Sequence, residues 1–318
     1  MKRKVAVFSP STVAEIKYKK QVNMALDNLR KLGFEPITFF QNKETRGRER
    51  ADLFNKILVD DSIDIILFTI GGYKAIELLP YIDYCKIQKT EKKIVGYSDC
   101  SLLLNSITTN TGLKTYLGPM LLPNFCEYPA PFKYTLKSFF HSIDDISWKK
   151  IKIPDKYFLE IIDWDGSEWG TRSRKSVDSN DELKFFKNST NIENTLTGTL
   201  LGGNGDSLVN ILNTEYFKVS SDTILFLEDN SDELSFENWI RIMTAFQIHG
   251  FFDKVKALII GHMPHFSVTL IENFLISLNL KIPFVIGFPS GHIDPIVTLP
   301  IGGKVKIDFS KNEIMVKG

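Results

Sequence analysis

Apolar β-type runs alternate with amphipathic helical stretches along the first part of the chain. The run at residues 63–70 is almost continuously apolar, which is typical of a strand covered on both faces. Between such runs, apolar residues recur at helical spacing. This βαβα alternation predicts an α/β fold with a parallel, doubly wound sheet of the flavodoxin type. The predicted strands are residues 5–8, 37–40, 63–70, 94–96 and 115–117, and the predicted helices are residues 17–32, 48–58, 73–82 and a segment from Asp99.

The pattern becomes less regular after the fifth predicted strand. A proline-rich connection is followed by a polar segment at residues 163–194, which we expect to be a long surface loop. From residue 196 a glycine turn joins a strand to a helix, further strands and helices follow, and a hairpin closes the chain. We therefore expect a flavodoxin-like N-terminal domain and a smaller, β-rich α/β C-terminal domain. The expected division is residues 1–150, a linker and surface loop at 151–195, and residues 196–318.

Composition narrows the class of protein and of partner. The 318 residues are 43% hydrophobic and 24% charged, as in soluble globular chains with room for two cores. The 39 basic and 38 acidic residues nearly cancel, so neither nucleic acid nor a membrane surface is an expected partner. No apolar run approaches the roughly 18 residues needed to span a bilayer, and no signal peptide is recognised. The three cysteines form no CxxC pair, which fits reduced thiols and a cytoplasmic location.

The segment IVGYSDCSLLLNSI places a serine where a strand pattern changes to a helix pattern. The apolar run ends at Gly96, Ser98 follows, and the helical pattern begins at once. On such a turn a serine is exposed beside backbone N–H groups that can stabilise an oxyanion. The string reads G-x-S-x-C where the hydrolase elbow reads G-x-S-x-G, and a serine before a helix is commonly an N-cap. Taken alone, the segment favours the N-cap.

A nucleophilic serine would need a base, and the chain has five histidines. His292 follows a buried strand in a loop rich in Gly and Pro, where α/β sheets display functional side chains. A loop histidine that only bonds backbone is an equal alternative. His141 and His249 lie in amphipathic segments and are expected to pack or to lie at the surface. His262 and His265 form a His-x-x-His pair, but without a cysteine or acidic ligand nearby no metal site is predicted.

Two acidic residues end the apolar run TILFLEDN. Glu228 and Asp229 are each either a helix cap or a functional carboxylate, and the run alone does not decide. Because side chains alternate along a strand, only one of the two can point into a cleft. We predict that Glu228 does so.

Three motifs, in this order, resemble those of the LD-carboxypeptidases, a serine peptidase family that includes the microcin C immunity proteins. They are GYSDCSLL, LFLEDNSDE and FPSGHIDPIVTLPIGG, and similar landmarks run over nearly the whole chain. The resemblance implies a flavodoxin-like domain and a smaller β-rich domain, with the site in the cleft between them. It also implies a homodimer without metal or cofactor.

The resemblance assigns roles to particular residues. It implies that Ser98 is the nucleophile, Glu228 the acid and His292 the base. The implied oxyanion hole consists of backbone N–H groups of Asp99 and of the turn Gly71–Gly72, where glycine lets backbone approach a substrate oxygen closely. Three departures from the family pattern remove no catalytic group: Ser101 for a threonine, Asn213 before Thr214, and GGNGDSL.

The expected activity is serine carboxypeptidase-type hydrolysis of a small peptide or peptidyl-nucleotide. The favoured substrate is a peptide- or aminoacyl-nucleotide of the microcin C class, and the alternative is a murein tetrapeptide that loses its terminal D-alanine. In the polar loop, Trp164 and Trp169 either stack on a base or only anchor the loop. We expect this loop to lie beside the cleft and to contribute little to stability.

A different class of protein also fits the layout. A non-catalytic protein would bind a small ligand in the same cleft, and the turns Gly71–Gly72 and Gly202–Gly203 would cradle phosphate or hydroxyl groups. Neither turn matches a P-loop or a G-x-G-x-x-G fingerprint. Hydrogen-bond contact between Ser98 and His292 would favour the enzyme.

Overall fold

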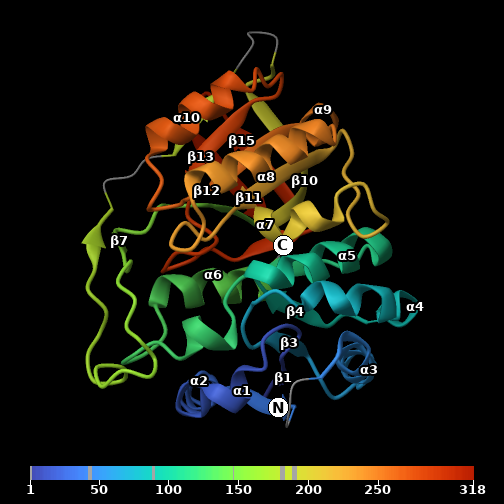
Figure 1. The fold of residues 1–318 in the computed structure, drawn as a ribbon, viewed down its shortest axis with the longest axis vertical. Helices are drawn as coiled ribbons and strands as arrows, with labels where there is room; N and C mark the ends of the chain where they lie inside the picture. Colours follow the sequence, from blue (N-terminus) through green and yellow to red (C-terminus); the bar gives the residue numbers. More distant parts are fainter. Residues whose placement is uncertain (1, 42–44, 88–89, 146, 180–182, 188–191) are drawn as a thin grey trace.

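The computed structural model describes residues 2–41, 45–87, 90–145, 147–179, 183–187 and 192–318. Two large sheets lie one above the other along the long axis of the molecule, with helices against their faces (Figure 1). A separate pair of short strands, β7 (Lys156–Tyr157) and β8 (Val177–Asp178), belongs to neither sheet. The molecule is therefore of the α/β class expected from the sequence.

The first sheet has the order β2–β1–β3–β4–β5–β14. Its first five strands run parallel in the flavodoxin order, and β14 (Leu299–Ile301) adds antiparallel to β5. The strands β3 and β5 are buried at every position, as expected for strands with helices on both faces. The other elements of this half are β1 (Lys4–Phe8), β2 (Glu35–Phe39), β3 (Ile65–Phe68), β4 (Lys93–Gly96), β5 (Thr115–Leu117), α1 (Ala14–Lys17), α2 (Lys19–Lys31), α3 (Gly47–Leu58), η1 (Ala75–Tyr81), α4 (Tyr84–Ile87), α5 (Ser101–Thr111), η3 (Leu121–Phe125) and α6 (Lys133–Asp144).

The second sheet has the order β6–β16–β15–β10–β11–β12–β13–β9. Strands β10 to β13 are parallel, and the strands on either side of them are antiparallel. The predicted hairpin is confirmed as β15 and β16. The elements are β6 (Trp148–Lys150), β9 (Lys184–Phe186), β10 (Thr195–Asn204), α7 (Gly205–Leu208), η4 (Val209–Ile211), β11 (Thr223–Glu228), α8 (Phe236–Ile248), α9 (Phe251–Lys254), β12 (Ala257–Gly261), α10 (Val268–Ser277), β13 (Phe284–Phe288), β15 (Lys304–Asp308) and β16 (Glu313–Lys317).

Strand membership crosses the expected boundaries at residues 150 and 195. The strands β6 and β9 precede residue 196 but pair in the second sheet, whereas β14 follows it and pairs in the first. Edge strands find their partners through contacts that are distant in sequence, so local periodicity does not reveal them. The polar segment 163–194 is accordingly not one continuous loop in its described part, because β8 and β9 interrupt it.

Two local features differ in detail from the sequence pattern. Residues 73–82 are helical as predicted over most of their length, but η1 is a 3₁₀-helix that contains Pro80, which lacks the N–H donor that an α-helix needs. Gly202 and Gly203 lie within strand β10 and not in a turn. A side chain on Gly203 would collide with Ser101, so the glycine allows α5 to pack against the strand. This pair of glycines therefore does not form a ligand cradle.

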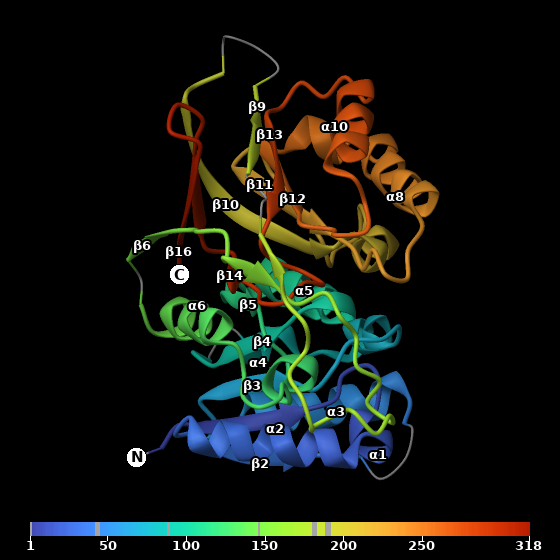
Figure 2. The same ribbon diagram turned by 90° about the vertical axis from the view of Figure 1, so that its left-hand side faces the viewer.

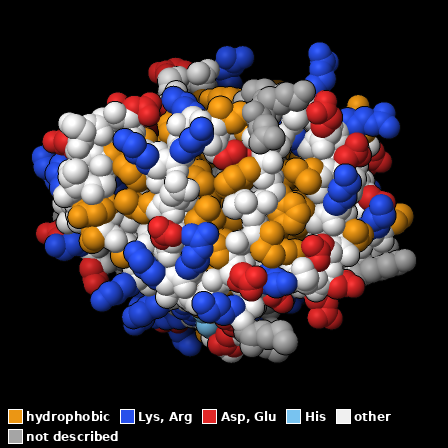
Figure 3. All heavy atoms as spheres, turned by 90° about the horizontal axis from the view of Figure 1, so that it is seen from below, with side chains coloured by type: hydrophobic (Ala, Val, Ile, Leu, Met, Phe, Trp, Pro, Cys, Tyr) orange, Lys and Arg blue, Asp and Glu red, His pale blue; other side chains and the backbone are white. Residues whose placement is uncertain are grey.

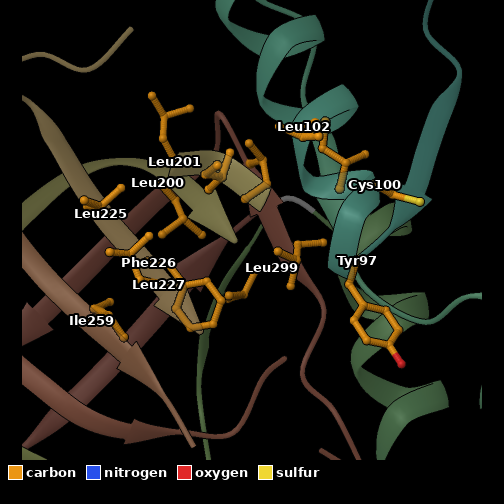
Figure 4. Packing of buried hydrophobic residues seen from close by; sticks show 14 of the residues in the cluster. Tyr97, Cys100, Leu102, Leu200, Leu201, Leu225, Phe226, Leu227, Ile259 and Leu299 are labelled. Atoms are coloured by element: carbon orange, nitrogen blue, oxygen red, sulfur yellow. The ribbon is translucent and has the colours of Figure 1, made fainter. Parts of the chain in front are cut away.

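A shared hydrophobic cluster joins the two halves of the molecule. It includes Cys100 and Leu102 from the first half together with Leu200 and Phe226 from the second (Figure 4). Figure 2 shows α5 and the edge strand β14 of the first sheet on the side of the first half that faces the second sheet, and both contact β10. Burial of apolar surface at this junction fixes the relative position of the strand ends that carry the site residues.

No described helix is long and apolar enough to cross a membrane. On the face shown in Figure 3, acidic and basic side chains are interspersed around hydrophobic ones, so this face is not uniformly basic.

Candidate active site

Ser98 lies on the tight turn between β4 and α5, where it begins the short 3₁₀ turn η2 (Ser98–Cys100). Its φ angle is +58°, and a residue other than glycine adopts this conformation at a cost of about 1–3 kcal/mol. The residues that cap η2 and α5 are Tyr97 and Cys100, so Ser98 is not an N-cap. The N-cap interpretation is therefore wrong, and the strained turn has the form of a nucleophile elbow.

Gly71 brings backbone directly against this serine. A Cβ atom on Gly71 would lie 2.8 Å from Ser98 Oγ and 3.4 Å from the backbone nitrogen of Asp99. The neighbouring Gly72 has a φ angle of +141° and packs against Ser11 and Thr12, where a side chain would collide. Both glycines thus allow a close backbone approach beside the hydroxyl.

His292 connects Ser98 to Glu228. The ring Nε2 lies 2.9 Å from Ser98 Oγ, and Nδ1 lies 2.8 Å from Glu228 Oε2. Burial lowers the pKa of His292, but the charge of Glu228 and its hydrogen bond outweigh this effect and raise the pKa above its usual value. The edge of the Tyr97 ring packs on the imidazole, with ring centroids 5.2 Å apart. Three residues from three distant segments therefore form one hydrogen-bonded chain.

Glu228 and Asp229 point to different neighbours, as the alternation of strand side chains requires. Glu228 is fully buried and contacts His292. Asp229 Oδ1 instead accepts hydrogen bonds from Asn204 Nδ2 at 3.2 Å and from the Asp206 backbone N–H at 2.8 Å. Only Glu228 is thus hydrogen-bonded to the imidazole.

The side chain of Asp99 stabilises the turn that carries Ser98 through two hydrogen bonds. Its Oδ2 accepts hydrogen bonds from Ser11 Oγ at 2.6 Å and from the Ala75 backbone N–H at 2.9 Å. Burial raises the pKa of this carboxyl, although these hydrogen bonds oppose the shift. Ser101 and Asn105 on α5 bond the backbone of β10, which ties the serine turn to the second sheet.

Ser98 and His292 open onto a cavity of about 590 Å³. Trp164 and Trp169 both line it, so the loop that carries them lies beside the site. Trp164 also packs edge-on against Tyr18, with ring centroids 4.8 Å apart, and its carbonyl accepts a hydrogen bond from Gln21. The two alternatives for these tryptophans are therefore compatible, since an anchored ring still presents a surface to the cavity.

Arg174 anchors the same loop to the histidine loop. Its Nη2 donates hydrogen bonds to Glu127 at 2.6 Å and to Asp294 at 2.7 Å, and all three side chains are largely buried. Asp294 lies two residues after His292, and its backbone carbonyl accepts a hydrogen bond from Phe158. This network argues against a loop that contributes little to stability.

The remaining histidines and the cysteines lie outside this chain of hydrogen bonds. His265 pairs with Asp232 at 2.5 Å, and His262 stacks on Tyr157, so the His-x-x-His pair is divided between two partners. His141 pairs with Asp145, and His249 contacts Asn213 at 3.0 Å. In the described parts of the chain, no group of three or more His, Cys, Asp or Glu is placed to hold a metal ion. All three cysteines are free thiols.

Sequence reasoning missed the supporting residues of the site. Arg174 and Glu127 stand in irregular segments where no periodicity or motif marks a buried ion pair. Asp294 belongs to the motif around His292, and its position in G-H-I-D-P was the one available signal. Asn204 was visible within GGNGDSL, where it caps α7 by accepting a hydrogen bond from the Ser207 N–H.

Comparisons with known proteins find relatives that match nearly the whole length of this chain. Residues 5–118 match the LD-carboxypeptidase N-terminal domain, and residues 197–307 match the LD-carboxypeptidase C-terminal domain. The microcin C7 self-immunity protein MccF of Escherichia coli is 30% identical, and the alignment covers 98% of this chain and 92% of that protein. A "probable murein peptide carboxypeptidase" of Bacillus subtilis is 23% identical over 98% of this chain and 91% of its own length.

Solved structures extend the similarity to the fold. MccF in complex with aspartyl sulfamoyl adenosine matches with a TM-score of 0.88 and 28% identity, covering 100% of this chain and 96% of that chain. MccF in complex with glutamyl sulfamoyl guanosine matches with a TM-score of 0.87 at 28% identity, covering 99% of this chain and 96% of that chain. The resemblance based on three motifs is confirmed by these matches. The chain belongs to the LD-carboxypeptidase family.

Proposed function

We propose that this protein is a serine peptidase of the carboxypeptidase type that inactivates an aminoacyl- or peptidyl-nucleotide of the microcin C class. The observation that carries the proposal is the chain of hydrogen bonds Ser98–His292–Glu228 at the wall of a cavity. A protein that only binds a ligand has no need of a strained serine held against a histidine. The non-catalytic alternative is therefore less favoured.

The proposed reaction follows the logic of serine peptidases. Ser98 Oγ attacks the carbonyl carbon while His292 Nε2 takes its proton, and Glu228 orients the ring and stabilises the imidazolium. The backbone N–H groups of Asp99 and of the turn Gly71–Gly72 stabilise the oxyanion. His292 then returns the proton to the leaving nitrogen. A water molecule finally attacks the acyl-serine ester and gives a proton to His292, which passes it to Ser98 Oγ as the ester bond breaks and the carboxylic acid is released.

The nucleotide class is favoured by the cavity and by the relatives. Trp164 and Trp169 offer aromatic surface in the same cavity as Ser98, and base–aromatic stacking contributes about 1–3 kcal/mol per base. Two of the similar MccF structures are complexes with aminoacyl sulfamoyl nucleosides. A murein tetrapeptide that releases D-alanine is the second candidate, supported by the similar murein peptide carboxypeptidase.

One assay separates the two substrate classes. The purified protein is incubated with glutamyl sulfamoyl adenosine and, separately, with a murein tetrapeptide, and the products are identified by mass. The proposal predicts release of sulfamoyl adenosine with a kcat/KM at least about tenfold above that for release of D-alanine. The reverse order would assign the protein to murein recycling, and cleavage of neither would contradict both candidates.

We further propose that the nucleophile is carried by a domain within residues 1–150 and the acid and base by a domain within residues 196–318. The family relationship also supports a cytoplasmic homodimer that acts on small molecules without a cofactor. Light scattering of the purified protein at several concentrations tests the dimer, since a single mass near the 36.3 kDa of one chain would contradict it.

A further inference from the structure

One part of the cavity is strongly acidic. Asp206 follows the end of β10, Asp229 follows the end of β11, and Asp232 and Glu233 lie in the loop after it. Because β10 and β11 are parallel neighbours, with Asn204 in register with Glu228, their carboxyl ends meet at one edge of the sheet. We call these four residues the acidic wall.

The charge of the acidic wall is not balanced by free cations in the described lining. The arginines that line the cavity are each held by carboxylates outside the wall: Arg172 by Glu160 and Glu168, and Arg174 by Glu127 and Asp294. No lysine is found among the described residues of the lining. In the wall itself, the side chain of His265 contacts Asp232.

The buried carboxylate of Asp229 also indicates that the acidic wall binds a cationic ligand. Its side chain is buried, with 2% of its surface exposed, and it lines the cavity. One oxygen, Oδ1, accepts two hydrogen bonds, whereas Oδ2 lies beside Gly205 and has no side-chain donor among the described residues. Burial and the nearby charge of Glu228 raise the pKa of Asp229 well above its ordinary value. A cationic group at this oxygen would favour the ionised carboxylate.

The acidic wall also lies close to the reacting groups. The charge of Glu233 raises the pKa of Tyr73, the residue that follows Gly72, and both residues line the cavity. The charges of Glu233 and Asp232 act on His292 as well. The wall therefore borders the place where the carbonyl group would sit.

We propose that the acidic wall binds an ammonium group on the acyl side of the scissile bond, so that the enzyme prefers cationic aminoacyl groups. This inference rests on the proposed function and names its substrate class. A phosphate or sulfamate beside four carboxyl groups would be repelled, which places the nucleotide half of the substrate elsewhere in the cavity, toward Trp164 and Trp169. The acyl half of the substrate then lies against the acidic wall.

Four substrates separate the two possible sources of the ammonium group. They are the lysyl, norleucyl, glutamyl and N-acetyl-norleucyl derivatives of sulfamoyl adenosine, and kcat/KM is measured for each. Lysyl and norleucyl differ in the side-chain ammonium, whereas norleucyl and its N-acetyl form differ in the α-ammonium. We expect at least one of these pairs to favour the charged member by about tenfold or more, and we expect glutamyl to be a poorer substrate than lysyl.

Variants link the preference to the acidic wall. Asp206 and Glu233 are exposed, so the double variant Asp206→Asn/Glu233→Gln should fold normally. This double variant should reduce the ratio of kcat/KM for the charged substrate to kcat/KM for the neutral substrate by about tenfold. Asp253→Asn removes one exposed carboxylate in α9, outside the described cavity lining, and should leave the ratio unchanged.

Each outcome has a defined meaning. A preference for lysyl that the double variant removes supports a side-chain subsite, and loss of rate on N-acetylation that the double variant weakens supports an α-amino subsite. Equal rates for all four substrates, or glutamyl as the best substrate, would overturn the inference while the proposed function stands. Cleavage of none of the four would overturn the proposed function itself.

Discussion

Glu228 Oε2 accepts two hydrogen bonds from His292, one from the ring Nδ1 at 2.8 Å and one from the backbone N–H at 3.0 Å. One buried oxygen therefore fixes both the main chain and the imidazole of the residue that faces Ser98. The close approach depends on Gly291, where any side chain would collide with the Glu228 carboxylate. Steric contact with Glu228 therefore explains why a glycine precedes the histidine in this motif.

Glu228→Gln should reduce kcat by about 10³–10⁴-fold, because an amide can hold the ring in the wrong tautomer and cannot stabilise the imidazolium. The matched variant Asp229→Asn alters a carboxyl that does not bond His292, and it should lower kcat by less than about tenfold. Steady-state kinetics on norleucyl sulfamoyl adenosine measures both. A larger loss for Asp229→Asn would sink the assignment of the acid.

The pH profile should reflect the raised pKa of His292. The base must be neutral to take the serine proton, so activity is present above the pKa and is lost as the pH falls through it. The acidic limb of kcat/KM should therefore lie above the usual histidine value of 6.5. In Glu228→Gln the raising charge is gone while burial remains, so the limb of the residual activity should move to lower pH. An unchanged limb would mean that another group titrates.

Gly71→Ala should impair catalysis without unfolding the protein. The added methyl group would lie 2.8 Å from Ser98 Oγ, so we expect kcat to fall by about tenfold or more. Gly33→Ala is the control, because this glycine has a φ angle of +92° and no atom near its missing Cβ. The control should lower the melting temperature slightly and keep kcat. Wild-type turnover in Gly71→Ala would show that the backbone here is not part of the site.

Arg174→Ala should destabilise the protein by about 3–5 kcal/mol, because it leaves two buried carboxylates without their partner. Arg172→Ala in the same loop removes a more exposed ion pair and should change stability by at most about 1 kcal/mol. Urea unfolding of both variants gives the comparison. Equal stability of the two variants would show that the loop carrying Arg172 and Arg174 contributes little to the stability of the protein.

Much of this site is predictable because its key residues stand at element ends that periodicity can locate. Ser98 follows one apolar strand, Glu228 ends a second and His292 follows a third, so a search for groups at strand ends finds all three. The positions of β9 and β14 could not be predicted in this way, because each of these edge strands is defined by a partner strand far away in the sequence. The Arg174 network has no local signal for the same reason.

The most direct test of the account is turnover by Ser98→Ala. The wild-type protein and this variant are compared for release of sulfamoyl adenosine from norleucyl sulfamoyl adenosine, after circular dichroism has shown that both are folded. Since the side chain of Ser98 bonds only His292 among its described contacts, the variant should keep the fold and lose at least about 10³-fold in kcat. Turnover within tenfold of the wild type would contradict the central claim that Ser98 is the nucleophile.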